Sequence, residues 1–399
     1  MQSKYKISRH GYRLRIGGIG IALLLLAAIC FGQTARSSPP SSFSDLHPAH
    51  AHTNWSEFHR PNMTRWNPHE SLLGVNNVEK LMEKWHYGTP GGNFSSPAVV
   101  DGVLYFGSED YGVYALNAKS GAPLWSYGTG FYVHSSPAVA RGLVYIGSEN
   151  WNLYGLDARS GTKVWSYLSG EGVWSSPVVA DGMVYFGSAD KSVYGLDAGT
   201  GAKLWSYSTR GSVESSPAVA NGIVYIGSDD KNAYALNART GALVWKYATS
   251  GQVFSSPTVA KGVVYVGSRD KNVYALNART GAKLWSYRTR DFVESSPAVA
   301  NGVVYVGSND NVLYALNAST GAMLWKHKTG YEVVSSPAVA NGVVYVGSWD
   351  GNLYALNAQT GATLWSYDMG VSISSSPVVV NGVVYVCSDG GDVYAFGLE

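Results

Sequence analysis

Apolar and polar positions along residues 291–329 fall into short extended runs separated by turns. The runs are Val293–Ala300, Val303–Gly307, Leu313–Asn317 and Leu324–Lys328, and the turns between them are rich in Gly, Asn, Asp and Ser. Short β-branched and aromatic runs joined by such turns predict four antiparallel strands connected as a meander. Both faces of the predicted sheet are apolar, which is typical of a sheet packed between two others.

The same unit recurs every forty residues without an insertion or a deletion. The tripeptide Ser-Ser-Pro begins at Ser95, Ser135, Ser175, Ser215, Ser255, Ser295, Ser335 and Ser375. A fixed period of this length predicts a repeat fold, in which one unit cannot bury its apolar surface alone. A four-stranded unit of about forty residues is typical of a β-propeller blade.

The two ends of the repeat array predict how the ring closes. The chain stops after Val393–Phe396, a third strand with no fourth, whereas Lys84–Tyr87 is a fourth strand with no preceding three. We therefore expect an all-β, eight-bladed β-propeller of four-stranded antiparallel blades, closed by the N-terminal strand completing the last blade. Because proline cannot donate to a sheet ladder, the Ser-Ser-Pro strand should be the inner edge. Its serine hydroxyls should then line a polar, water-filled bore.

The N-terminal region differs in composition from the repeats. Five cations (Lys4, Lys6, Arg9, Arg13 and Arg15) precede the apolar run Gly17–Phe31, so the net charge of +2 does not describe the repeats. We interpret residues 1–32 as a signal peptide or N-terminal anchor, with lipidation at Cys30 as an alternative. Residues 33–54 are predicted to be a flexible linker, 55–80 a lead-in segment, and 81–399 the propeller. We expect an extracytoplasmic monomer (periplasmic, secreted or anchored in the cell envelope), with an N-terminal membrane tether as one alternative.

The composition limits the classes of chemistry. Apolar residues make up 45% and charged residues 14% of the chain, as in a folded protein. The repeats carry no basic patch with interleaved aromatic residues, which argues against nucleic acid. Several histidines could bind a transition metal, but no Cys or carboxylate stands at metal-ligand spacing beside them, so a polar linker is the preferred interpretation. These histidines are His47, His50, His52, His59 and His69.

One motif resembles that of a known family. Residues 115–125 read Ala-Leu-Asn-Ala-Lys-Ser-Gly-Ala-Pro-Leu-Trp. This segment is similar to the tryptophan-docking motif, A-x-[DN]-x-x-[TS]-G-x-x-x-W, of the pyrroloquinoline quinone (PQQ)-like repeat family of β-propellers. Gly121 suits a turn position with positive φ, while Asn117 and Ser120 can hydrogen-bond the turn backbone. We expect the tryptophans to be structural, each docking against a neighbouring blade. They are Trp85, Trp125, Trp165, Trp205, Trp245, Trp285, Trp325 and Trp365.

The resemblance covers residues 55–399, because residues 76–85 and the positions of Trp55, Arg65 and Asn67 are similar to quinoprotein dehydrogenases. Those enzymes stack PQQ against a vicinal disulfide, hold Ca²⁺ with Glu and Asn, and use an Asp as base. This chain has no adjacent cysteine pair and no long insertions, and Cys387 stands alone in place of a strand glycine. PQQ and Ca²⁺ are therefore implied by the resemblance alone, and we predict no catalytic, cofactor or metal site. The fold also resembles the propeller lipoprotein of the outer-membrane assembly machinery.

Variation between repeats is confined to two of the four connections. The turns between the first and second strands and between the third and fourth strands barely change. The other two connections differ in every blade and should emerge together on the opposite face. Because function is carried by loops on a rigid scaffold, this variable face is the predicted binding face. Its candidate residues are Phe94, Tyr111, Tyr132, His134, Trp151, Trp174, Glu214, Phe254, Glu294 and Trp349.

Exposed aromatic side chains not needed for packing favour recognition of a protein, peptide or glycan partner. The alternative interpretation is drift at positions that tolerate solvent. The sequence therefore predicts a non-catalytic binding or scaffolding propeller. A PQQ-dependent quinoprotein oxidoreductase and a ligand-sensing surface module are the alternatives. Aspartates after Gly-Ser, such as Asp110, are interpreted as turn caps and not as calcium ligands.

Overall fold

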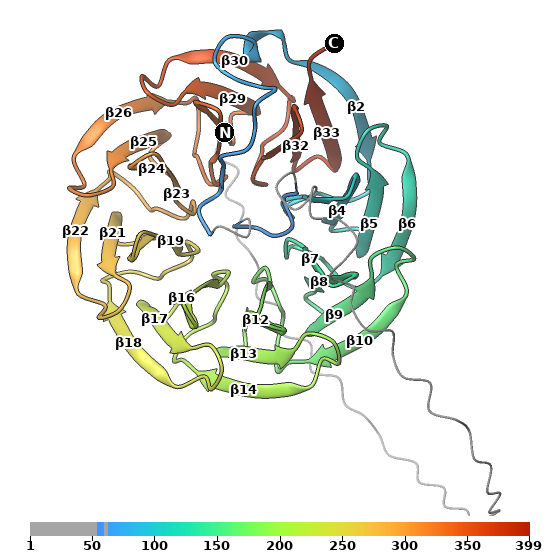
Figure 1. The fold of residues 1–399 in the computed structure, drawn as a ribbon, viewed down its shortest axis with the longest axis vertical. Coiled ribbons are helices and arrows are strands. Elements are labelled where there is room, and N and C mark those ends of the chain that lie inside the picture. Colours follow the sequence, from blue (N-terminus) through green and yellow to red (C-terminus); the bar gives the residue numbers. More distant parts are fainter. Residues whose placement is uncertain (1–53, 60–62) are drawn as a thin grey trace, which may run out of the picture. The chain divides into compact units, whose positions relative to one another are not determined.

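Eight antiparallel sheets follow one another around a ring in the computed structural model, which describes residues 54–59 and 63–399 (Figure 1). The predicted eight-bladed β-propeller is confirmed. The proposed signal peptide or anchor, Cys30 and all but the last residue of the predicted linker lie outside the described residues. Within the described ranges, no helix is long and apolar enough to cross a membrane, and the helical element is the short 3-10 turn η2 (Val78–Lys80).

Every blade has a first, second, third and fourth strand from the inside outwards, which follow one another in sequence except in the last blade. The first strands are β3 (Ala98–Val100), β7 (Ala138–Ala140), β11 (Val178–Ala180), β15 (Ala218–Ala220), β19 (Thr258–Ala260), β23 (Ala298–Ala300), β27 (Ala338–Ala340) and β31 (Val378–Val380). The second strands are β4 (Val103–Gly107), β8 (Leu143–Gly147), β12 (Met183–Ser188), β16 (Ile223–Ser228), β20 (Val263–Ser268), β24 (Val303–Ser308), β28 (Val343–Gly347) and β32 (Val383–Cys387). The third strands are β5 (Gly112–Asn117), β9 (Asn152–Asp157), β13 (Ser192–Asp197), β17 (Asn232–Asn237), β21 (Asn272–Asn277), β25 (Val312–Asn317), β29 (Asn352–Asn357) and β33 (Asp392–Gly397). The fourth strands are β6 (Pro123–Gly128), β10 (Lys163–Leu168), β14 (Lys203–Ser208), β18 (Leu243–Ala248), β22 (Lys283–Arg288), β26 (Met323–Lys328), β30 (Thr363–Asp368) and, from the N-terminal side, β2 (Met82–Gly88).

The last blade joins the two ends of the repeat array. β2 pairs antiparallel with β33, with Trp85 opposite Ala395 and Tyr87 opposite Val393. The predicted closure by an N-terminal strand is confirmed, although the strand is longer than the predicted Lys84–Tyr87. Because the fourth strand of this blade comes from the other end of the chain, the ring cannot open at the seam without breaking a sheet.

Each docking tryptophan packs on the next blade. The Trp85 indole lies over Gly121, where an added Cβ would sit 2.7 Å from the ring, and its Nε1 donates to the carbonyl of Ala118 at 3.1 Å. Gly121 has a φ of 72°, and the side-chain oxygen of Asn117 accepts the amide of Ser120. The motif thus places the Trp85 side chain against the turn of the neighbouring blade. The ring of docking contacts closes where Trp365 Nε1 donates to the carbonyl of Leu81 at 3.1 Å.

The inner strands are shorter than predicted and their serines are not exposed to a bore. The predicted run Val293–Ala300 forms a strand only over β23. Upstream of it, the Ser296 amide donates to Ser336 Oγ of the next blade at 2.9 Å, and Ser295 Oγ donates to the carbonyl of Ser335. The equivalent amide-to-hydroxyl bond joins every adjacent pair of blades. All sixteen serines of the Ser-Ser-Pro motifs are buried, so these hydroxyls connect blades and do not line a water-filled bore.

The lead-in segment lies along the inner edges of the blades, which corrects the expectation of an open polar bore. The amides of Val99, Val139, Val299 and Val339 donate to the carbonyls of Trp55, Ser56, Thr64 and Arg65 respectively, at 2.7–3.0 Å. Strand β1 (Trp66–Asn67) pairs parallel with β27, so that the seventh blade has five strands. In Figure 1 this blue segment crosses the centre of the ring. The inner edges therefore bind the chain's own backbone.

Arg65 anchors the lead-in segment at the centre. Its guanidinium is fully buried and donates to the carbonyls of Pro337, Pro377 and Phe58. It also lies 4.7 Å from the centroid of the Phe58 ring. A buried cation requires such dense hydrogen bonding to offset its desolvation, and the burial lowers the pKa of Arg65 to about 9.

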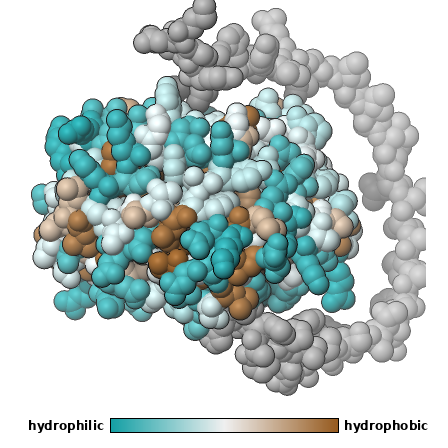
Figure 2. All heavy atoms as spheres, turned by 90° about the horizontal axis from the view of Figure 1, so that it is seen from above, coloured by the Kyte–Doolittle hydropathy of each residue, from teal (hydrophilic) through white to brown (hydrophobic). Residues whose placement is uncertain are grey.

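Apolar side chains fill the space between adjacent sheets. Tyr105 and Val113 of the first blade, for example, share one buried cluster with Val144 and Leu156 of the second. The rim, seen edge-on in Figure 2, is mostly hydrophilic, and its apolar side chains gather in separate patches.

Candidate binding face

Two connections of each blade meet on the variable face. In the first blade these are the turn Ser108–Tyr111 between β4 and β5 and the connection Thr129–His134 between β6 and β7. The amide of Thr129 donates to the carbonyl of Tyr111 at 2.8 Å, and that of Val133 donates to the carbonyl of Ser108 at 3.2 Å. The hydrogen bonds place both connections on the same face of the ring, opposite the turns Asp101–Gly102 and Ala118–Ala122.

An aspartate makes many of these turns rigid. Asp110 Oδ1 accepts the amide of Gly112 at 2.9 Å, and Oδ2 accepts the hydroxyl of Tyr114 at 2.6 Å. The same aspartate–tyrosine bond recurs in five further blades. These carboxylates act as turn caps, as the sequence predicted.

Aromatic side chains form a continuous cluster over the first three blades. The His134 ring lies 5.2 Å from Phe94, 5.1 Å from Trp174 and 6.0 Å from Tyr132 between centroids. Tyr132 in turn contacts Tyr111 at 5.3 Å. The structure thus brings five of the candidate residues together from connections that are far apart in sequence, and we call them the aromatic cluster.

The outer members of this sector are held in an unfavourable backbone conformation. Tyr111 and Trp151 have φ values of 75° and 76°, in the left-handed region. The same turn position is left-handed in every blade, and it is occupied by Lys191, Lys231, Lys271 and Asn311 in the next four and by Gly351 and Gly391 in the last two. Bulky residues rarely adopt this conformation. The side chains of Tyr111 and Trp151 are nevertheless 42% and 50% exposed, so packing does not account for aromatic residues at these two positions.

Two glutamates hold His134 from opposite sides. Nε2 of the imidazole lies 2.9 Å from Glu109 Oε1, and Nδ1 lies 2.8 Å from Glu149 Oε1. Burial by itself would lower the pKa of His134, but the hydrogen bonds and charges of both glutamates raise it to about 9. His134 is therefore a cation at neutral pH, placed between two carboxylates and beside three aromatic rings.

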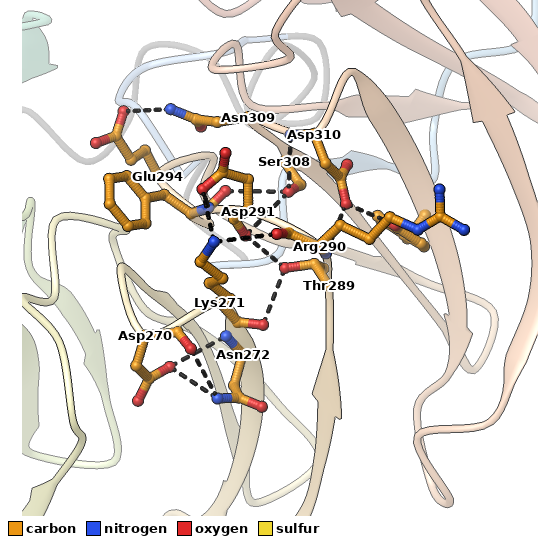
Figure 3. A network of polar contacts seen from close by, with 12 residues as sticks. Asp270, Lys271, Asn272, Thr289, Arg290, Asp291, Glu294, Ser308, Asn309 and Asp310 are labelled. Carbon is orange, nitrogen blue, oxygen red and sulfur yellow. Dashed lines mark hydrogen bonds and ion pairs between the residues drawn. The ribbon is translucent and has the colours of Figure 1, made fainter.

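Charged residues dominate the same face over the fourth to sixth blades. Arg269 Nε donates to Glu294 Oε1 at 2.5 Å, and its guanidinium carbon lies 3.6 Å from the centroid of the Phe254 ring. Figure 3 shows the neighbouring contacts, in which Lys271 Nζ lies 3.3 Å from Asp291. Burial and then the charge of Asp229 raise the pKa of Glu214 to about 7. This sector is a network of paired charges.

Trp349 stands apart from the aromatic cluster. Its Nε1 donates to Ser374 Oγ at 2.9 Å, and the same hydroxyl donates to Asp389 Oδ2 at 2.8 Å. Burial raises the pKa of Asp389, although its hydrogen bonds with Ser372 and Ser374 oppose this shift.

Sequence reasoning missed Glu109 and Glu149. Each follows the Gly-Ser of a second strand, one residue before the repeating turn position, and nothing in the repeat indicates what it faces. The pairing arises because the Glu149 amide donates to the carbonyl of Tyr132, which brings the second blade's turn beside the connection that carries His134.

Comparisons with known proteins agree with this fold. A sequence profile of the family described as "Outer membrane protein assembly factor BamB" matches residues 82–166, 129–216, 209–293 and 291–399. The chain belongs to this family of PQQ-like repeat propellers. A comparison with curated protein sequences finds no significant match.

Solved structures that resemble the chain include members and neighbours of this family. A europium-containing methanol dehydrogenase aligns with a TM-score of 0.79 and 16% identity, over 87% of this chain and 98% of that one. BamB from Moraxella catarrhalis aligns with a TM-score of 0.70 and 21% identity, over 80% and 100%. The quinohemoprotein alcohol dehydrogenase from Comamonas testosteroni gives 0.76 and 17%, over 86% and 80%. Likeness at these identities establishes the fold alone.

Among the described residues, the variable face holds no adjacent cysteine pair of the kind that the resemblance to quinoprotein dehydrogenases implies for PQQ. Cys387 is a single buried thiol, so no vicinal disulfide can form beside it. Four carboxylates of the variable face have partners: Glu109 and Glu149 lie against His134, Glu294 accepts from Arg269, and Asp389 accepts serine hydroxyls. Of the histidines considered for metal binding, His59 is buried among the lead-in residues with its pKa lowered to about 3, mainly by burial. His47, His50 and His52 lie outside the described residues.

Proposed function

We propose that this protein is a non-catalytic binding or scaffolding propeller that works outside the cytoplasm and engages a partner through its variable face. The observation that supports the proposal is the aromatic cluster with its neighbour Trp151. Bulky aromatic side chains at left-handed turn positions are costly, and such cost is most often found at functional sites. Tyr111 and Trp151 are the residues on which the proposal depends.

The charges around the cluster favour a particular partner chemistry. Glu109, Glu149 and Glu171 lie on the connections that carry the aromatic side chains. Aromatic faces and carboxylates together attract cations that also have apolar stems, such as lysine and arginine side chains. A protein or peptide segment with basic residues therefore fits this sector better than a neutral glycan does.

The family to which the chain belongs also favours a protein partner. Its description names an outer membrane protein assembly factor, and an assembly factor acts by binding other proteins. An extracytoplasmic location agrees with the cationic and apolar N-terminal segment of the sequence.

The experiment uses glycine in place of the two strained aromatic residues. Tyr111→Gly and Trp151→Gly remove the side chains and introduce the residue found at the same turn in the last two blades, so folding should be retained. Affinity capture from envelope extract with the double variant should lose the partners that the wild type binds. Asn311→Gly is the matched control, because Asn311 has a φ of 67° at the same turn outside the cluster.

Capture that is unchanged in the double variant would exclude the aromatic sector as the binding site. Partners that disappear after glycosidase treatment of the extract would identify a glycan in place of a peptide.

The second candidate, a quinoprotein oxidoreductase, is favoured by the structural likeness to two dehydrogenases. Adding PQQ and Ca²⁺ and measuring dye-linked oxidation of alcohols and sugars tests it directly. Turnover above that of the buffer would overturn the non-catalytic proposal. Saturable binding of a small molecule from extract, with no captured protein, would instead support a ligand-sensing module.

A further inference from the structure

The face opposite the variable face is built from turns of constant length. In each complete blade, two residues join the first and second strands, as at Asp101–Gly102, and five join the third and fourth, as at Ala118–Ala122. The amide of Ala118 donates to the carbonyl of Gly102 at 2.9 Å, and the same bond recurs around the ring. We call the surface formed by these turns the floor face. Equal turns on equivalent strands end at a comparable level around the ring, and two hollows open between them, one lined by Asn221, Lys261 and Arg279 and one by Leu72, Val75 and Asn341.

Basic residues collect on the floor face of the first five blades. Their side chains are exposed, and they occupy the turns or the first position of the outer strand. They are Lys119, Arg141, Arg159, Lys163, Lys203, Arg239, Lys261, Arg279 and Lys283. The equivalent turn positions of the following blades are uncharged, as at Asn301, Ser319 and Gln359.

The acidic residues of the floor face oppose this charge only in part. Asp157 and Asp197 each accept the amides of their own turns through Oδ1, and Asp101 accepts the side chain of Asn54. Asp181 and Glu79 are exposed. The variable face has the opposite character in most blades, since acidic residues outnumber basic ones on it in six of the eight, the third and fifth blades being balanced. The ring therefore carries charge of opposite sign on its two faces.

Apolar side chains of the lead-in segment cover the remaining part of the floor face. Leu72 is 59% exposed and lies against the turn at Gly382, and Val75 is 37% exposed beside the turn at Gly342. Exposed apolar residues beside a basic area are the composition of surfaces that rest at a lipid interface. The floor face thus combines both contributions to interfacial binding, basic residues and exposed apolar side chains.

The described chain also begins on this face. Asn54 exchanges two hydrogen bonds of 3.2 Å with Asp101 in the first floor turn. The residues that precede it include the cationic and apolar N-terminal run. Asn54, the first described residue, therefore lies at the floor face.

We infer that the floor face docks on an anionic lipid surface, with the variable face directed away from the membrane. Each basic residue close to an anionic leaflet strengthens binding about fivefold. The occupant is a lipid surface because exposed basic side chains of five blades and the exposed apolar side chains of Leu72 and Val75 lie on the same face, which suits anionic headgroups above an acyl layer. The inference does not depend on the proposed function, and either can fail alone.

The test compares two charge-reversal variants of the full chain. The floor variant is Lys163→Glu, Lys203→Glu, Arg239→Glu and Lys283→Glu. The control variant is Lys191→Glu, Arg210→Glu, Lys231→Glu and Arg290→Glu on the variable face, which changes the net charge equally. Binding to sucrose-loaded vesicles of phosphatidylcholine alone and of equal parts phosphatidylcholine and phosphatidylglycerol is measured by cosedimentation. Because both variants keep the N-terminal residues, any binding through those residues is the same in each.

The wild type and the control variant should bind the anionic vesicles more tightly than the neutral ones. In the floor variant, the ratio of the two binding constants should fall at least tenfold. An anionic preference that survives in the floor variant, or that the control variant loses equally, would overturn the inference. Hydrogen exchange of the wild type on the same vesicles gives a readout that needs no variant. The floor turns, such as Arg159–Thr162, should be protected while the turns around Lys191 and Lys231 are not, and the reverse pattern would also overturn it.

Discussion

The backbone amide of Ser376 donates to the hydroxyl oxygen of Ser96 at 2.9 Å, although 280 residues separate them. This contact closes a ring of identical serine bonds between the inner ends of all eight blades. Both residues are nearly inaccessible to solvent, so neither group can exchange its partner for water.

Ser96→Ala should therefore destabilise the protein by about 1–3 kcal/mol, because it leaves the Ser376 amide buried without an acceptor. Chemical denaturation of the variant measures this loss. Ser120→Ala removes an exposed serine hydroxyl from a floor turn and should cost less than about 1 kcal/mol. Equal losses in the two variants would show that the inner ring does not contribute more than an ordinary surface bond.

Arg65→Met should release the lead-in segment from the centre of the ring. The substitution keeps an apolar stem but leaves the carbonyls of Pro337 and Pro377 without their donor. Amide exchange at Val99, Val139 and Val299, which donate to the lead-in backbone, should become faster by about tenfold or more. Lys80→Met, an exposed change in the same segment, should leave that exchange as in the wild type, and slow exchange in Arg65→Met would contradict the anchoring role.

Glu57 should make the lead-in segment sensitive to pH. Burial raises the pKa of Glu57 to about 7, and the hydrogen bond from the Val179 amide only partly opposes this. The folded pKa is above the unfolded value of 4.5, so its contribution to stability is complete below pH 4.5 and is lost as the pH rises through 7. Glu57→Gln keeps an acceptor for the Val179 amide without the charge. The melting temperature of this variant should depend less on pH across this window than that of the wild type. If the melting temperature of Glu57→Gln depended on pH as strongly as that of the wild type, the effect would belong to another titratable group.

His134 should titrate well above an ordinary histidine, with a pKa of about 9. Because this exceeds the unfolded value of 6.5, its stabilising pairs are complete below pH 6.5 and are lost as the pH rises through about 9. Glu149→Gln should lower the pKa of His134, as followed by nuclear magnetic resonance of the imidazole. Glu171→Gln, on the next connection, is the control. An equal shift of the His134 pKa in both variants would show that the overall negative charge of the sector, and not the hydrogen bond with Glu149, raises it.

Cys387 marks the seam between the last and first blades. At the equivalent position in the third blade, an added Cβ on Gly187 would lie 2.4 Å from Cγ1 of Val213. The residue in the place of that valine at the seam is Asn93, whose amide donates to Ser388. Gly187→Cys should therefore destabilise by about 1–3 kcal/mol through overpacking. Adding Val213→Asn should recover part of that loss in a double-mutant cycle, whereas purely additive losses would show that the two positions do not compensate.

The predictable part of the fold is the part repeated in every blade. Sequence reasoning could place Gly121 at its turn, Trp125 on its outer strand and the seam strand near Trp85. Each of these features repeats at a fixed spacing and contacts only the neighbouring blade. The inner strand was predicted too long because Ser295 and Ser296 satisfy their hydrogen bonds in the next blade. The two variable connections do lie on one face, but Glu109 and Glu149 were not expected beside His134, since that contact depends on how connections from two blades pair.

The sequence by itself determined the number of blades, their order, the closing strand and the face on which the repeats differ. These features follow from short-range periodicity, in which strand patterns and turn residues act within one unit or on the adjacent one. The tertiary structure decided what occupies the centre of the ring, the charge on His134 and the opposite electrostatic character of the two faces. Each of these depends on residues that lie far apart along the chain and come together only when the ring is closed. Burial and neighbouring charges set the pKa values and polar contacts, and both arise only on folding.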